Sequence, residues 1–190
     1  MKELSLNILD VAENSVKAGA SLTEILIDEK GDTLTLTIKD DGCGMTPEVV
    51  KAVTDPFYTT RTTRKVGLGV PLLKLAAEQT GGSLCVESKT AQASPDDHGT
   101  TVTAVFFKNH LDFTPLGDVV SSITTLIQGH PETDFYYCHS NERAKVELDT
   151  RQLREVLGDV PLNSYEVIKW TEEYLQEQYE GFNKGRANQI

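Results

Sequence analysis

The feature that most constrains this fold is a predicted strand that runs directly into a glycine-rich turn. Between Thr33 and Lys39 apolar and polar side chains alternate, which is typical of a strand with one buried face. Residues 40–45, Asp-Asp-Gly-Cys-Gly-Met, follow it. A carboxylate at a strand end, followed by glycines that let a flat ligand approach the backbone, is consistent with a purine pocket. The pattern also occurs in ordinary glycine turns, so its meaning depends on its surroundings.

A helix is predicted over residues 4–18, and glycine follows it as a stop signal. Its apolar residues recur at helical spacing and are expected to face a core: Leu4, Ile8, Val11, Ala12 and Val16. Polar residues spaced three or four apart form a stripe on another face: Asn7, Asp10, Asn14 and Lys17. Such a stripe is either a solvated helix face or one wall of a site, and the spacing leaves both open.

The remaining pattern up to residue 108 predicts further strands and helices. Strands are expected over residues 21–29, 83–88 and 100–108. One short helix is expected to begin at Thr46, and a second helix is expected over residues 70–80. Residues 55–67 are polar and basic without periodicity, and they are expected to form a mobile loop. This order predicts an α/β two-layer sandwich in which helices cover one face of a mixed sheet.

Composition narrows the class of protein. A chain of 190 residues with 38% hydrophobic and 25% charged residues fits a soluble globular domain, alone or with an extension. The net charge of −11 argues against nucleic acid or an anionic membrane as the main partner. Three cysteines lack metal-ligand spacing, and no apolar run approaches the roughly 20 residues of a membrane span. A cytoplasmic protein is therefore expected.

Four motifs in this order resemble the ATP-binding domain of the GHKL superfamily. They are Glu13-Asn14-Ser15, residues 40–45, Gly67-Leu68-Gly69 and Gly99-Thr100-Thr101. The superfamily includes sensor histidine kinases, type II topoisomerases, mismatch-repair ATPases and anti-sigma serine kinases. The resemblance covers roughly residues 4–108 and implies the Bergerat fold, with ATP and Mg²⁺ as cofactors.

The resemblance also implies roles for particular residues. Asn14 would hold the magnesium ion that bridges the nucleotide phosphates, which suits the ion's preference for oxygen ligands and retained water. Asp40 would accept from the adenine amino group, and Thr100 would support that end of the site. The loop over residues 55–67 corresponds to the lid of the family's nucleotide site. The rest of the implied nucleotide-binding set lies in this lid and in or beside the four motifs: Lys17, Gly42, Gly44, Met45, Phe57, Gly67, Leu68, Gly69 and Val70.

The segment before the helix over residues 70–80 suits a phosphate group for a physical reason. Gly67-Leu68-Gly69 would place free backbone N–H groups and a helix N-terminus at an anion. The neighbouring cations Arg61, Arg64 and Lys65 would either screen the phosphates or belong to a solvated loop.

The chain also departs from the sensor kinases. Lys65 stands where those kinases usually have a glycine, and no phosphoacceptor-histidine hairpin is expected before Leu4. None of the four histidines is followed by an acidic residue, as the acceptor usually is. Asp10 lies four residues before Asn14, where other branches place a glutamate that activates the attacking water or serine. Its carboxylate is the candidate general base, although aspartate is shorter by one methylene.

The sequence is therefore expected to form an ATP-binding domain over residues 1–110 and a C-terminal α/β extension over residues 111–190. In the extension, helices are predicted over residues 115–128, 150–157 and 164–179, and a hairpin is predicted from residues 134–139 and 145–148. The extension could pack on the ATP-binding domain, form a homodimer or bind a protein partner.

Two functions remain open at this point. The leading hypothesis is a Mg–ATP-binding, histidine kinase-like domain that acts in trans as a signalling kinase or regulatory ATPase, with Asp10 as catalytic residue. The alternative is an ATP-gated protein-binding switch that resembles anti-sigma factors and turns over little or no ATP. A third reading, a relative of the mismatch-repair ATPases, would require a transducer domain. The expected partner is a protein or a phosphoacceptor in trans, without nucleic acid or membrane.

Overall fold

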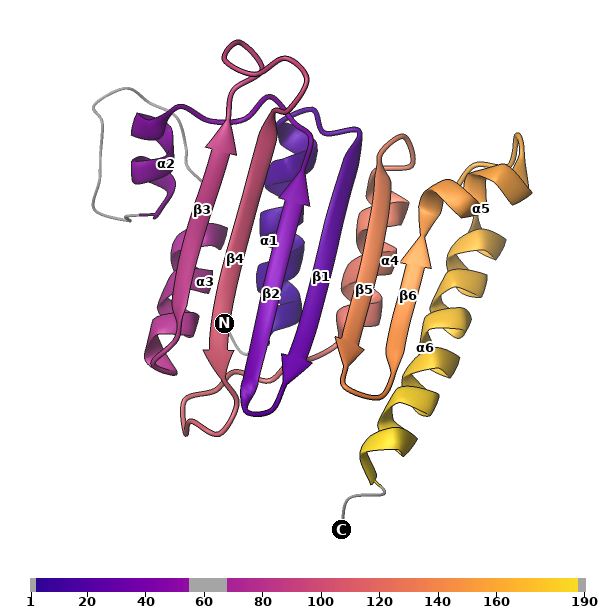
Figure 1. Cartoon of the computed structure of the whole chain (residues 1–190). Helices are drawn as coiled ribbons and strands as arrows, with labels where there is room; N and C mark the ends of the chain where they lie inside the picture. The colour runs from indigo at the N-terminus through magenta and orange to yellow at the C-terminus, as the bar shows by residue number, and fades with distance from the viewer. Residues whose placement is uncertain (1–2, 55–67, 188–190) are drawn as a thin grey trace.

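A single mixed sheet organises the computed structural model, which describes residues 3–54 and 68–187 of the chain. The described strands form a six-stranded sheet in the order β3-β4-β2-β1-β5-β6 (Figure 1). Neighbouring strands are antiparallel, except that β1 and β5 pair in parallel. The strands are β1 (Leu22–Lys30), β2 (Thr33–Asp40), β3 (Ser83–Lys89), β4 (Gly99–Phe107), β5 (Asp134–Asn141) and β6 (Lys145–Asp149).

Three helices, α1 (Leu4–Lys17), α3 (Gly69–Gln79) and α4 (Val119–Gly129), cover one face of this sheet. The other described helices are α2 (Pro47–Thr54), α5 (Thr150–Leu157) and α6 (Tyr165–Ala187). In Figure 1, α1, α3 and α4 lie behind the sheet, and α6 runs along its β6 edge, where it packs on α4 and β6. The predicted two-layer sandwich is thus confirmed. No helix in the described ranges is long and apolar enough to cross a membrane.

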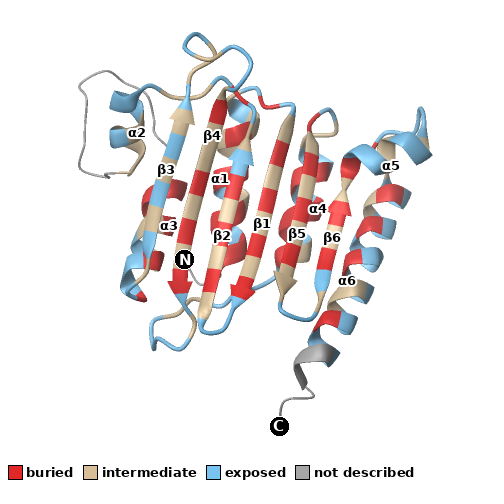
Figure 2. Cartoon of the chain, viewed as in Figure 1, coloured by how far each residue is buried: buried red, intermediate tan, exposed pale blue. Residues whose placement is uncertain are grey.

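The core follows directly from the alternation in the strands. Buried and half-buried residues alternate along β1, β2 and β5, as the banded strands in Figure 2 show. The buried residues of each strand face the helices, because successive side chains of a strand point to opposite faces. From the opposite layer, α1 buries four of its five predicted core residues: Leu4, Ile8, Val11 and Ala12.

The described part of the chain after residue 110 continues the same sheet. Strand β5 pairs in parallel with β1, from Leu22 opposite Asp134 to Glu29 opposite Asn141. The segment before α4 also caps α1, since the carbonyl of Pro115 accepts from the Leu4 N–H at 2.9 Å. The predicted hairpin is confirmed as β5 and β6. The division into two domains near residue 110 remains a prediction, and both segments contribute to one sheet.

Two predicted helix boundaries in this part were wrong. The helix expected from residue 115 begins at Val119, because Asp118 caps it through a 2.9 Å hydrogen bond from the Ser121 N–H to Oδ1. The helix expected to end at residue 179 continues to Ala187. Gly181 is a weak helix former, but Phe182 is buried against the core and stabilises the additional turns.

Leu75 of α3 is apolar, but it is 52% exposed. Helix α3 buries the face that carries Val70, Leu73 and Ala77, whose spacing of three and four residues defines a single stripe. Leu75 lies outside that stripe. Its exposure depends on which face of α3 packs against the sheet.

Candidate nucleotide-binding site

The carboxylate of Asp40, at the end of β2, is held by three hydrogen bonds. The Ser15 hydroxyl donates to Oδ2 at 2.7 Å, while the N–H groups of Gly42 and Thr100 donate to Oδ1 at 3.0 and 3.2 Å. Ser15 lies on α1 directly after Asn14, so its bond joins the helix to the glycine turn. These donors orient a half-buried carboxylate at the predicted adenine end of the site.

The glycine turn itself is packed too tightly for any other residue at Gly44. Its φ is 69°, and an added Cβ would lie 1.8 Å from the Lys89 carbonyl oxygen. The Ala91 N–H donates to the Cys43 carbonyl at 3.1 Å beside it. Packing against the end of β3 therefore explains this glycine without a ligand.

Side chains from the β3–β4 segment hold the same turn. The Met45 N–H donates to Ser88 Oγ at 2.8 Å, and Ser88 Oγ lies 2.9 Å from Thr100 Oγ1. The Nδ1–H of His98 donates to the Gly42 carbonyl at 2.6 Å. The predicted residues Gly42, Met45 and Thr100 are thus brought together with Ser88 and His98, which the sequence reasoning did not assign to the site.

Asp41, the second acid of the turn, fastens it to the start of β1. Its Oδ1 accepts from the N–H groups of Ser21 and Leu22 at 2.7 and 3.0 Å, and the Ser21 hydroxyl donates to Oδ2. Partial burial raises the pKa of Asp41, but the hydrogen bonds from Leu22 and Ser21 outweigh it and leave the pKa below its ordinary value.

This shift predicts a pH-dependent contribution to stability. Because the folded pKa is lowered, the contribution is present above the unfolded pKa of about 4 and is lost as the pH falls through the folded value. Asp41→Ala should lower the free energy of unfolding by about 1 kcal/mol at pH 7, and the difference should shrink at pH 3. Urea unfolding at both pH values measures it. Asp96→Ala, an exposed loop carboxylate, is the control, and an equal loss there would contradict the assignment.

A cavity of about 360 Å³ lies between α1 and the start of α3. Its lining consists of Asp10, Glu13, Asn14 and Lys17 from α1, with Leu68 and Gly69 from the beginning of α3. An added Cβ at Gly69 would lie 2.9 Å from the Asp10 Cβ, so the absence of a side chain lets α3 begin against α1. The polar stripe and the second glycine motif therefore meet in one cavity.

The start of α3 gives this cavity an anion-binding character. Leu68 precedes the helix and provides no side-chain cap, and the first helical N–H groups have no acceptor within the helix. Together with the positive end of the helix dipole, these N–H groups favour a negatively charged group at Gly69. Val70 itself is 7% exposed and packs in the core, so its side chain does not line the cavity.

The polar stripe of α1 is narrower than predicted. Asn7 is buried, and its Nδ2 has no hydrogen-bond partner within the described residues. Asp10 and Lys17 are exposed, whereas Asn14 is half-buried. Glu13 also lines the cavity and accepts from His130 Nε2 at 2.7 Å. The helix therefore offers the cavity two carboxylates, an amide and an ammonium group.

The donor set suits a metal that takes most of its ligands from elsewhere. In the part of the chain that the structure describes, no group of three or more His, Cys, Asp or Glu side chains is placed so that it could hold a metal ion. The Asn14 side chain makes no hydrogen bond within that part, so its amide oxygen is available. Magnesium keeps several waters and binds through few protein oxygens plus substrate phosphates, and this arrangement fits it.

Some predicted residues lie outside the described ranges. Phe57, Gly67 and the lid cations at 61, 64 and 65 belong to residues 55–67, and their predicted roles remain predictions. Of the residues that the predictions missed, Ser15 carried a usable signal, because it follows Asn14 in the sequence. Ser88 opposes Thr100 in the pairing of β3 with β4. Pairing register, which the sequence did not provide, was needed to place Ser88.

Comparison with known proteins places this geometry among ATPases. Residues 2–110 match the family described as histidine kinase-, DNA gyrase B-, and HSP90-like ATPase. The sensor protein SrrB of Staphylococcus aureus is 33% identical over 99 residues, which make up 50% of this chain and 17% of that protein. The chain thus spans a small part of the curated relatives it matches.

Solved structures share the fold. The N-terminal domain of a DNA repair protein aligns with a TM-score of 0.55 at 18% identity, covering 78% of this chain and 53% of that one. The Aquifex aeolicus MutL ATPase domain, complexed with ADP, aligns with a TM-score of 0.50 at 16% identity, covering 83% and 69%. The mixed sheet with its helices is the Bergerat ATPase fold, and α6 lies beyond the part that the family match covers.

Proposed function

Because this chain belongs to the family of histidine kinase-, DNA gyrase B-, and HSP90-like ATPases, we propose that it binds Mg–ATP between α1, the glycine turn and the start of α3. The observation that carries the proposal is the cavity in which Asp10 and Asn14 face the N-terminus of α3 at Gly69. The Ser15–Asp40 hydrogen bond connects this cavity to the turn, so an adenine end and a phosphate end adjoin.

The adenine end would discriminate between purines. Three donors from the protein already hold the Asp40 carboxylate, and the lone pair that remains on Oδ2 can accept from the exocyclic amine of adenine. Guanine presents a carbonyl at that position and would leave two acceptors facing each other. ATP and ADP should therefore bind, and GTP should not. Calorimetric titration of the full chain tests this, and equal affinities for ATP and GTP would overturn the adenine assignment.

At the phosphate end, some residues would bind the phosphates and the metal ion, and another would act in phosphoryl transfer. The N–H groups at the start of α3 and the Lys17 ammonium would hold phosphate oxygens, while the Asn14 amide oxygen would ligate the magnesium ion. When bound, the metal would neutralise charge on the phosphates. Asp10 would take the proton from the attacking hydroxyl or water as the bond to the γ-phosphorus forms and ADP leaves.

We further propose that the chain acts in trans, as a signalling kinase or a regulatory ATPase. The family match and the similarity to a sensor protein support nucleotide chemistry of this kind. Incubation of the protein and Mg²⁺ with γ-labelled ATP and cell lysate tests it. Label on another protein would support a kinase, and label released as phosphate would support an ATPase. Binding without any turnover would favour the ATP-gated protein-binding switch instead.

The metal role of Asn14 gives a separate prediction. Asn14→Ala should weaken ATP binding about tenfold in magnesium, because an oxygen ligand is lost, and should change it little in the presence of a chelator. Calorimetry under both conditions measures the difference. Lys17→Ala is the matched comparison, one helical turn away, and its loss should persist in chelator because a phosphate contact needs no metal. An identical loss for Asn14→Ala in both conditions would indicate damage to α1.

A further inference from the structure

A larger cavity, of about 830 Å³, lies at the opposite end of the sheet from the candidate nucleotide site. It forms where the ends of β1, β4 and β5 meet the start of α4 and the C-terminal half of α6. Its volume is within the range of small-molecule sites in proteins. Residues from both the family-matched part and the remainder of the chain line it, so it exists only in the complete sheet.

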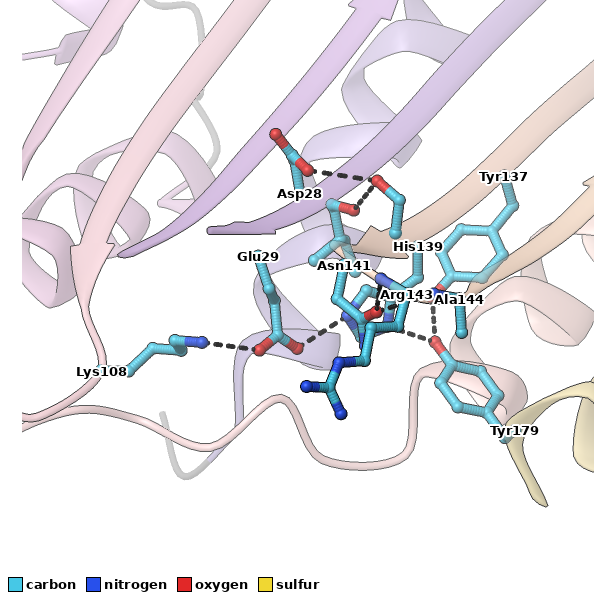
Figure 3. A network of polar contacts seen from close by, with 11 residues as sticks. Asp28, Glu29, Lys108, Tyr137, His139, Asn141, Arg143, Ala144 and Tyr179 are labelled. Carbon is cyan, nitrogen blue, oxygen red and sulfur yellow. Dashed lines mark hydrogen bonds and ion pairs between the residues drawn. The ribbon is translucent and has the colours of Figure 1, made fainter. Parts of the chain in front are cut away.

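One wall of the cavity is a chain of buried polar groups, which Figure 3 shows. Lys108 Nζ donates to Glu29 Oε2 at 2.9 Å, and His139 Nε2–H donates to Glu29 Oε1 at 2.9 Å. His139 Nδ1 lies 2.8 Å from the Tyr179 hydroxyl, which also contacts the Tyr137 hydroxyl. Glu29 is 6% and His139 is 1% exposed, so these groups are built into the wall.

The polar groups of this wall hydrogen-bond to one another. The Tyr179 hydroxyl lies between the Tyr137 hydroxyl and His139 Nδ1 and hydrogen-bonds to both. Burial raises the pKa of Tyr137 well above its ordinary value, which keeps its phenol protonated as a donor. The negative charge of Glu29 is matched by the Lys108 ammonium group. The wall therefore offers a ligand no uncompensated carboxylate.

The turn between β5 and β6 adds a cation to the mouth of the cavity. Asn141 Oδ1 accepts from the N–H groups of Arg143 and Ala144, both at 2.8 Å, which fixes the turn. Arg143 lines the same cavity as Glu29 and His139, and Figure 3 draws all three side chains. Within the described ranges, no acceptor engages its guanidinium group. An exposed guanidinium with unused donors at a cavity mouth is suited to a carboxylate.

Two acidic residues also line the cavity and must be weighed against this cation. Asp118 is occupied as the cap of α4, where its oxygens accept from the N–H and the hydroxyl of Ser121. Glu142 precedes Arg143 in the exposed turn. Lys108 engages Glu29 and Ser121 engages Asp118, so Glu142 is the lining carboxylate whose charge would oppose that of a bound anion.

The rest of the lining is largely apolar. It includes Leu34, Phe113, Leu116, Val119, Val120 and Phe182. We propose that this cavity binds a small organic anion, with a carboxylate held by the Arg143 guanidinium and an apolar body packed against these side chains. Charge-assisted hydrogen bonds from the guanidinium would hold the carboxylate of such a ligand, and burial of apolar surface would stabilise its apolar part.

Calorimetric titration of the full chain with octanoate, without nucleotide, tests the proposal. Octanoate should bind, and octan-1-ol, which has the same chain length without the charge, should bind about tenfold more weakly or worse. Arg143→Gln should weaken octanoate binding about tenfold and leave octan-1-ol unchanged. Glu142→Gln is the matched control in the same turn, and it should retain or tighten octanoate binding because a like charge is removed.

Three outcomes would overturn the proposal. One is the absence of octanoate binding at millimolar concentration, and another is an Arg143→Gln variant that binds octanoate as well as the wild type. The third is acetate binding as tightly as octanoate, since the apolar wall would then contribute nothing. Arg143 is exposed on a turn, so its variant should keep the wild-type melting temperature. None of these results depends on the nucleotide site.

Discussion

Replacing Asp10 with asparagine should slow ATP turnover by about 10²- to 10⁴-fold, the contribution typical of a general base. The substitution is nearly isosteric, so the approach of α3 at Gly69 is preserved. ATP affinity should stay within a few-fold, because the proposed ground-state contacts lie at Asp40, Asn14 and the start of α3. Single-turnover kinetics combined with calorimetric titration separates the rate from the affinity.

Two variants sharpen this result. Asp159→Asn makes the same chemical change at an exposed residue after α5 and should leave the rate unaltered. Asp10→Glu restores a carboxylate with one more methylene and should retain most of the activity if reach is the limiting factor. An Asp10→Asn variant that turns over ATP at the wild-type rate would identify Asp10 as an ordinary solvated side chain.

Replacing Asp40 with alanine should abolish the preference for ATP over GTP and weaken ATP binding by about 10- to 100-fold. A charge-assisted hydrogen bond to the exocyclic amine accounts for that range. The same change leaves the Ser15 hydroxyl and the N–H groups of Gly42 and Thr100 without their acceptor. It should therefore also lower the free energy of unfolding by about 1–3 kcal/mol. Calorimetry and urea unfolding measure the two effects.

Less severe variants distinguish recognition of the base from support of the turn. Asp40→Asn leaves an amide oxygen that can still accept, and its affinity for ATP should lie between those of the wild type and Asp40→Ala. Ser15→Ala keeps the carboxylate and removes one donor, so it should lower stability more than purine selectivity. Full ATP selectivity in a folded Asp40→Ala variant would contradict the adenine role.

Local sequence determined most of the secondary structure of this protein. The alternation in β1 and β2 and the helical spacing of Leu4, Ile8 and Val11 set the side chains that become buried. These periods are properties of the backbone geometry, and they can be read without knowledge of any neighbour. The glycine turn and the polar stripe of α1 were recognisable for the same reason, as local patterns of residue type.

Tertiary structure alone decided which elements meet. Nothing in the sequence placed β5 beside β1 in parallel, since a parallel neighbour is set by a long connection and not by a local signal. The burial of Asn7 and the exposure of Leu75 likewise followed from the direction in which α1 and α3 pack.

In the candidate site, too, some residues could be predicted from the sequence and others could be found only in the folded structure. The sequence supplied Asp10, Asn14, Asp40 and the glycines, because their chemistry and spacing are local. The bonds of Ser15 to Asp40 and of Ser88 to Met45 span 25 and 43 residues, so only the folded sheet could reveal them. The cavity at the other end of the sheet had no local signature at all, because Glu29, His139 and Tyr179 come from three distant elements that only their shared packing brings together.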